Sequence, residues 1–308
     1  MAVLLVLGSV ALFLNRGTSS PGADLPAQLA TTLSALPASS RRAAAHVVDL
    51  TITEPGHVTN VAALVLPHDL AVTTTVIPVT AHITGSSATK VNFPVTLISH
   101  DDVMGFSIVR LSVPIAAPRL DPMPASTAVV AIAPVVTGPT RPPEYFWAAT
   151  TLGDPTNSAQ GVVRYLATTN ESSLSSYVDA IAVDANGDVV AVLSARRRWY
   201  AATFVAQVAS VQANGRGCHA VLGITGTTEQ GGGVLVQRIV PYGAAWRAQL
   251  KVGDVITAWN GTALETWTQL ASTLYLTSAY TSSKLTYAQG THVHHTTAYF
   301  DCPSKLVK

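Results

Sequence analysis

Residues 243–261 read GAAWRAQLKVGDVITAWNG, and this stretch decides how the C-terminal part of the chain should fold. It opens with a short helix candidate, Ala244–Gln249, continues into an apolar run of strand length and closes on an Asn-Gly turn pair, which favours a tight turn between strands. The strand VLVQRIV (residues 234–240) precedes it, and a helix candidate, Thr266–Leu276, and the strand KLTYAQ (284–289) follow it. The block between Cys218 and Cys302 is therefore expected to be a small β-rich domain.

The order of these signals resembles a PDZ domain over the whole block. The phrase at 243–261 is similar to that family's conserved core, and Leu222-Gly223-Ile224 matches the loop that holds a peptide's C-terminal carboxylate. The family pattern has Gly where this chain has Gln249, so that residue must adopt a positive φ or the helix must end differently.

This resemblance implies a peptide-binding groove with a physical basis. Successive backbone N–H groups at a Gly-containing turn form a nest for an anion, and the strand that begins at Ile224 would accept a ligand as an added strand. The pocket between that strand and the helix at 266–276 would select the ligand side chain, with Leu270 and Leu274 as its floor. The expected partners are peptides or proteins with apolar C-termini.

The chain from about His46 to residue 201 shows short apolar strands separated by turn residues. Segments of this kind are HVVDLTI (46–52), VAALVL (61–66), LAVTTTVI (70–77), VNFPVTLI (91–98), FSIVRL (106–111) and AVVAIAPV (128–135). Strands of this length and spacing predict a β-sandwich or a barrel. One helix is expected at Ala202–Asn214, where apolar residues recur at helical spacing before Gly215.

A β domain, a bridging helix and a PDZ-like domain in this order resemble the bacterial HtrA-type serine proteases, over about residues 44–302. The resemblance implies a mainly β protein, with a trypsin-like double β-barrel followed by a PDZ domain. The family's His phrase matches VTTTVI (72–77) with Val76 at the His position, and its Asp phrase matches residues 101–110 with Gly105 at the Asp position. Counting back from the turn at 184–187 puts Val178, or Tyr177 in a shifted register, at the Ser position.

None of these three residues can do the chemistry of a triad. Valine neither accepts a proton nor attacks a carbonyl, and glycine cannot orient a base. Asp179 and Ala180 replace the glycines that follow the family's Ser, which also puts the oxyanion donors in doubt. We therefore expect a catalytically degenerate member, a pseudoprotease with no catalytic residues, that binds peptides.

An active HtrA-type endopeptidase with a shifted triad is the alternative. It would draw its nucleophile from the serines at 172, 173, 175 and 176. Its base would be one of the histidines at 46, 57, 68, 82 and 100, with His82 the first to test. A third hypothesis is that the β domain serves mainly for self-association, which predicts a homo-oligomer.

The N-terminus predicts a membrane tether. Residues 2–14 (AVLLVLGSVALFL) carry no charge, but the run is shorter than the ~20 residues of a spanning helix, so it is a truncated anchor or a signal segment. The following Ser-, Pro- and Ala-rich stretch has the composition of a linker. The expected organisation is anchor 1–15, linker 16–43, β domain 44–201, helix 202–215 and PDZ domain 216–303, held at the membrane outside the cytoplasm.

Composition and cysteine usage narrow the function further. The net charge of +1 in 308 residues gives no global field for nucleic acid. Cys218 and Cys302 are the two cysteines, and in an exported chain they are expected to form a disulfide rather than a metal or redox site. His292 and His294 could share one strand face, but a solvent-facing hairpin is the expectation for them. No cofactor or metal is expected.

Overall fold

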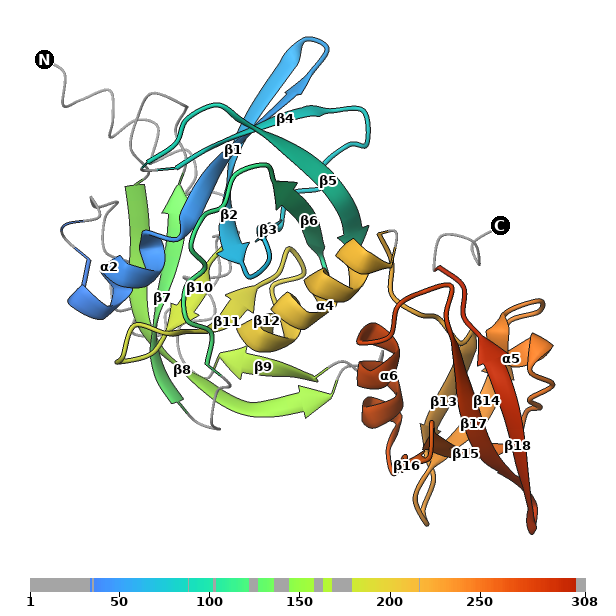
Figure 1. Cartoon of the computed structure of the whole chain (residues 1–308). Helices are drawn as coiled ribbons and strands as arrows, with labels where there is room; N and C mark the ends of the chain where they lie inside the picture. The colour runs from blue at the N-terminus through green and yellow to red at the C-terminus, as the bar shows by residue number, and fades with distance from the viewer. Residues whose placement is uncertain are drawn as a thin grey trace, which may run out of the picture.

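A computed structural model describes residues 34, 36–87, 89–101, 104–121, 127–135, 144–157, 163–167, 179–215 and 217–302. It contains two closed six-stranded barrels followed by a separate mixed domain (Figure 1). The chain is mainly β, as the sequence predicted.

The first barrel has the strand order β1-β2-β3-β6-β5-β4, all pairs antiparallel. Its strands are β1 (Val47–Glu54), β2 (His57–Leu66), β3 (Leu70–Thr73), β4 (His82–Ser86), β5 (Phe93–Asp101) and β6 (Phe106–Leu111). The barrel is filled by apolar side chains such as Leu50, Ala63 and Val109, which are fully buried. The predicted strand at 70–77 is too long, because β3 ends at Thr73.

The second barrel has the order β10-β11-β12-β9-β8-β7. Its strands are β7 (Thr127–Val135), β8 (Glu144–Asn157), β9 (Val163–Ala167), β10 (Ile181–Val183), β11 (Val189–Leu193) and β12 (Trp199–Ala201). Helix α4 (Ala202–Asn214) follows the second barrel at the predicted bounds. Helix α2 (Ala38–Ala44) precedes the first barrel, so the end of the stretch predicted as a flexible linker is helical, with Ala43 and Ala44 buried.

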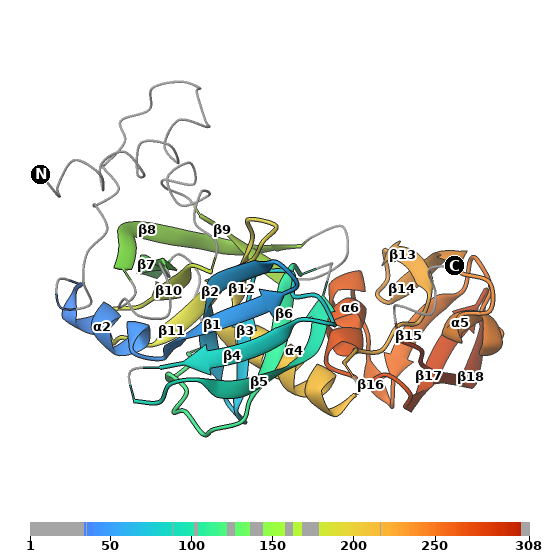
Figure 2. The same cartoon turned by 90° about the horizontal axis from the view of Figure 1, so that it is seen from above.

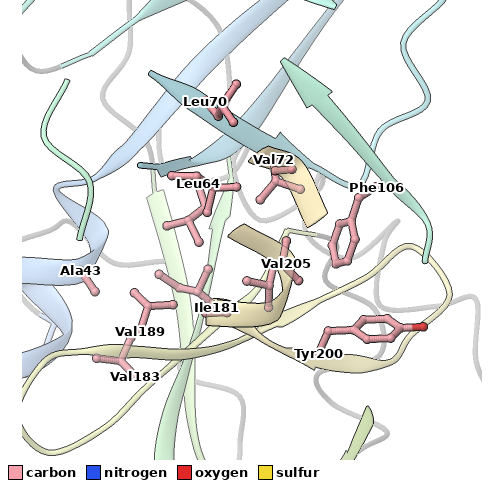
Figure 3. Close-up of a cluster of buried hydrophobic side chains, with 14 of the residues drawn as sticks. Ala43, Leu64, Leu70, Val72, Phe106, Ile181, Val183, Val189, Tyr200 and Val205 are labelled. Atoms are coloured by element: carbon pink, nitrogen blue, oxygen red, sulfur yellow. The ribbon is translucent and has the colours of Figure 1, made fainter. Parts of the chain in front are cut away.

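One hydrophobic core joins the barrels and the two helices. Leu64, Leu70 and Val72 come from the first barrel, and they face Ile181, Val183 and Val189 of the second, with Ala43 of α2 at one side and Val205 of α4 at the other (Figure 3). Phe106 of β6 packs edge-on against Tyr200 of β12, with ring centroids 5.9 Å apart. The two barrels therefore form one packed body, and their contact region lies along β3.

The C-terminal domain is a sheet with the order β13-β14-β15-β17-β18, and β16 pairs with β15. Its elements are β13 (Ile224–Thr228), β14 (Val234–Ile239), α5 (Ala244–Arg247), β15 (Val255–Trp259), β16 (Thr262–Ala263), α6 (Trp267–Tyr275), β17 (Ser282–Gln289) and β18 (His292–Tyr299). Helix α6 begins at Thr266 with a complete capping box to Gln269, an arrangement that satisfies two donors of the first turn. Gln249 has a φ of +63°, which is the first of the two alternatives that the sequence left open there.

Cys218 and Cys302 are bonded to each other, with their Cα atoms 5.6 Å apart, so the predicted disulfide is confirmed. It closes the C-terminal domain where the chain enters and leaves it. Figures 1 and 2 show α6 on the side of this domain that faces the barrels and α5 on the far side.

The predicted anchor (1–15) and most of the linker (16–43) lie outside the described residues. Within the described part of the chain, no helix has the length and apolar character needed to cross a membrane.

Candidate functional site

The three segments that resemble the triad phrases meet just beyond strand β3. The Thr73 hydroxyl donates to Oδ1 of Asp179 over 3.1 Å, and the Thr74 backbone N–H donates to the same oxygen over 2.5 Å. The Ser107 hydroxyl, on β6, donates to the Thr75 carbonyl over 2.5 Å. Residues 73–75 therefore contact both of the other segments, as a triad requires of the three stretches that supply it.

The structure describes two of the three predicted triad positions, Val76 and Gly105. Val76 is 63% exposed. Gly105 has a φ of +79°, and a Cβ added to it would lie 3.0 Å from Cγ of Arg196. Val178 and the serines at 172–176 lie outside the described residues. The assignment of Val76, Gly105 and Val178 to triad positions stays a prediction, supported by the contacts of their neighbours.

Asp179 is a residue whose role the sequence did not reveal. It has a φ of +62°, in the left-handed region that favours glycine. Burial raises the pKa of its carboxyl to about 6, and the hydrogen bonds from Thr74 and Thr73 oppose this rise only in part. The signal in the sequence was a charged residue at a position where the resemblance expects glycine.

Two of the histidines named as candidate bases lie on strands β4 and β5 of the first barrel. His82 is exposed at the start of β4, three strands from β3 in the barrel order. Within the described residues it forms no hydrogen bond with a serine or an aspartate. His100 Nδ1 lies 2.9 Å from the Ser107 hydroxyl, but Ser107 is fully buried and already hydrogen-bonded to Thr75, so no substrate reaches it.

The second candidate site is the turn at the start of β13. The Leu222 carbonyl accepts from the Ala245 N–H and the Gly223 carbonyl from the Val240 N–H, each over 2.8 Å. Within the described residues, the N–H groups of Leu222 and Gly223 donate to no other group. With a φ of +78° at Gly223, the turn holds its acceptors against the protein and leaves donors for an anion.

An open strand edge continues from this turn. Strand β13 is the first strand of the sheet, so one of its sides has no strand partner, and α6 contacts it. Leu274 of α6 is partly buried at this edge, whereas Leu270 is fully buried in the domain core. Both predicted floor residues thus lie on the helix that contacts β13, with Leu270 at greater depth.

Polar side chains buried at the junction of the two domains link helix α6 to the barrels. Gln212 of α4 donates from Nε2 to Oδ2 of Asp101 over 2.9 Å, and it also pairs with Ser99. His219 Nδ1 lies 3.6 Å from the same Asp101 oxygen. The His219 ring stacks on Tyr275 at the end of α6, with centroids 4.1 Å apart. Burial lowers the pKa of His219, and Asp101 opposes this effect.

Asp101 also fixes the turn that carries Gly105. Its Oδ1 accepts from the Met104 N–H over 3.0 Å, and its carbonyl accepts from the Gly105 N–H over 2.7 Å. A single carboxylate therefore contacts the turn of the predicted Asp position and the first residues of the C-terminal domain.

The described residues contain one group of acidic side chains with metal-like spacing. Ligand oxygens of Asp121, Asp184 and Asp188 lie within 4.8 Å of one another. Asp188 already lies 3.4 Å from the Arg119 guanidinium, and Asp184 accepts from two backbone N–H groups of its own turn. Arg119 thus offsets one of the three negative charges, and the turn backbone binds a second carboxylate. On β18, His294 stacks on Tyr287 and His295 pairs with the Thr286 hydroxyl across the hairpin.

Comparisons with known proteins match both parts of the chain. Residues 210–287 match the PDZ domain family. A solved structure of the HtrA-type protease AlgW with a tripeptide superposes with a TM-score of 0.61 at 14% identity, covering 85% of this chain and 95% of that one. AlgW with a decapeptide gives 0.59 at 13% identity, covering 86% and 97%. A serine endoprotease from Yersinia pestis gives 0.57 at 14% identity, covering 89% and 99%.

A search of curated protein sequences finds no match. The chain thus has the fold of the HtrA-type proteases, a trypsin-like double barrel followed by a PDZ domain, as the sequence analysis predicted. At 13–14% identity the similarity establishes the fold alone.

Proposed function

We propose that this protein is a non-catalytic peptide-binding protein that holds the C-termini of partner proteins in its PDZ groove. The observation that carries the proposal is the Leu222-Gly223 turn, whose carbonyls are bound within the domain while its N–H groups face no protein acceptor among the described residues. The solved AlgW structures contain peptides, which supports a peptide as the ligand class. An apolar last residue would pack against Leu274.

The absence of catalysis follows from residue chemistry at the predicted triad positions. Val76 and Gly105 have no ionisable side chain, so neither can act as a base or orient one. Asp179, which replaces a glycine after the predicted Ser position, engages Thr73 and Thr74. These contacts give Asp179 a structural role that does not depend on catalysis.

The test is a titration with an octapeptide that ends in valine, prepared with a free and with an amidated C-terminus. Carboxylate recognition predicts that the free acid binds at least about tenfold more tightly, since amidation removes a charge-assisted set of hydrogen bonds. Equal affinity for both forms would reject the proposal. A peptide that is cleaved during the titration would reject its non-catalytic part.

An active endopeptidase is the second candidate, and the fold itself favours it, because the solved structures that share it are described as proteases. Its nucleophile would come from the serines at 172–176 and its base from His82. Incubation with casein distinguishes the two candidates, since release of peptides above a buffer control would favour the protease.

We further propose that residues 2–14 tether the protein to the membrane, with the barrels and the PDZ domain outside the cytoplasm. The uncharged run and the polar linker that follows it support this placement. Fractionation of cells that produce the full chain, and then a chain starting at residue 34, tests it. Recovery of both forms in the soluble fraction would reject the tether. Sedimentation of the shorter chain reports whether the barrels assemble into a homo-oligomer.

A further inference from the structure

The direction of a bound peptide follows from the geometry of β13. A carboxylate at the Leu222-Gly223 turn places the last ligand residue beside Ile224, and an added antiparallel strand then runs toward Thr228. Side chains alternate along a strand with a period of two. The last and the third-from-last ligand side chains therefore face α6, near Leu274 and Trp267 respectively.

Trp267 ends the apolar part of this groove. Its backbone N–H donates to the Thr228 hydroxyl over 3.0 Å, which joins the start of α6 to the end of β13. Its ring reaches β13 itself, because a Cβ on Gly226 would lie 3.3 Å from Cζ3 of Trp267. The apolar groove thus spans only Ile224 to Gly226, enough for about three ligand residues at about 3.3 Å each.

Two glutamates stand where a longer ligand would leave the groove. Glu229 follows β13 directly, and Glu265 precedes the N-cap of α6. Both backbones bind the same residue, since the Glu229 N–H donates to the Gly233 carbonyl over 3.0 Å and the Gly233 N–H donates to the Glu265 carbonyl over 3.1 Å. The two residues are therefore held together at the Thr228 end.

The remaining carboxylates of the PDZ domain are already compensated. Asp301 pairs with Arg247 over 2.7 Å. Asp254 is buried and accepts from the Lys251 N–H and from Gln289. Within the described residues, Glu229 and Glu265 form no ion pair. The groove consequently has anion donors at the Leu222-Gly223 end and uncompensated negative charge at the other.

We propose that the groove selects partners with an apolar last residue and a basic residue at the fourth or fifth position from the C-terminus. This inference rests on the proposed function. An added strand of five residues places its fourth and fifth residues from the C-terminus past Trp267, where a Lys or Arg side chain lies within reach of Glu229 and Glu265. Such complementarity at an exposed rim contributes selectivity more than total affinity.

The experiment compares three valine-terminated octapeptides with a free C-terminus, which carry Lys, Gln or Glu at both the fourth and fifth positions from the end. Exposed ion pairs contribute about 0.2–1 kcal/mol each, or about 1.4- to fivefold in affinity. The Lys peptide should bind about fivefold or more tightly than the Glu peptide at 20 mM salt. Screening should reduce the ratio below about twofold at 0.5 M salt.

The variant E229Q/E265Q should lose this preference while its affinity for the Gln peptide stays within about twofold of wild type. Glu54→Gln, in the first barrel, is the matched control and should keep the preference. Equal binding of the Lys and Glu peptides at low salt, or a preference that persists in E229Q/E265Q, would overturn the inference. Those results would not contradict carboxylate recognition. If none of the three free-acid peptides binds better than its amide, the proposed function is rejected as well.

Discussion

Replacing Asp179 by Asn should stabilise the protein at neutral pH and leave it unchanged in acid. The carboxyl pKa is raised from 3.8 to about 6, chiefly by burial. A group whose pKa is higher in the folded state binds more protons there, so stability falls as pH rises through this window and stays low above it. The rise corresponds to at most about 3 kcal/mol of lost stability above pH 6.

An asparagine at this position keeps a carbonyl oxygen for the Thr74 N–H and carries no charge to desolvate. Urea unfolding of the wild type and of D179N, from pH 3.5 to 7.5, should give equal midpoints near pH 3.5. The variant should gain about 2–3 kcal/mol by pH 7. Asp69→Asn, on the exposed turn before β3, is the matched control and should run parallel to the wild type. A D179N curve that also runs parallel to the wild type would show that burial of this carboxylate does not destabilise the fold.

Three further outcomes follow from the second site and from the domain junction. Gly223→Ala should weaken free-acid peptide binding about tenfold, because φ is +78° there, while Gly231→Ala, with open space around its Cα, should have no effect; a binding assay on both variants decides this. Burial lowers the pKa of His219 and so favours its neutral form, which means that the ring's contribution to docking of α6 on the barrels is present above pH 6.5 and is lost as pH falls below that value. Hydrogen-exchange protection factors of α6 should therefore be lower at pH 5.5 than at pH 7.5, and unchanged protection would contradict this. Removing the Cys218–Cys302 bond, whose ends are 84 positions apart in the sequence, should destabilise the PDZ domain by about 4–5 kcal/mol, and a thermal midpoint unaffected by reductant would contradict this.

The sequence predicted the architecture well because the architecture depends on local patterns. Helix α4 ends where an Asn-Gly pair follows apolar residues at helical spacing, and α6 begins at a capping box. The strands of the first barrel alternate short apolar runs with turn residues. These signals lie within a few residues of each other, so one chain suffices to read them.

The contacts that join distant segments were not predictable in the same way. Thr74 and Asp179 meet across 105 residues, and Asp101 and Gln212 across 111. Nothing local indicates that a carboxylate at 179 will accept from the end of β3 rather than face water. The length of β3 was wrong for the same reason, because residues 74 and 75 leave the strand to bind Asp179 and Ser107.

The outline of the groove could be predicted from the sequence, but the prediction was incomplete in detail. The turn at Leu222-Gly223 and the helix at 266–276 were predicted from the resemblance of the local sequence to a PDZ domain. The role of Trp267 as the end of the apolar groove could not be predicted, because it depends on the contact of its ring with Gly226. Selectivity depends on such contacts between elements, and periodicity carries no information about them.

Intact-mass spectrometry after exposure to a fluorophosphonate probe is the sharpest test of the proposal that this protein binds peptides without cleaving them. The reagent reacts with serines that a neighbouring base activates. We expect residues 34–308 to keep their unmodified mass under conditions that label an active trypsin-like control completely. A stoichiometric adduct mapped to any serine, including those at 172–176, would contradict it.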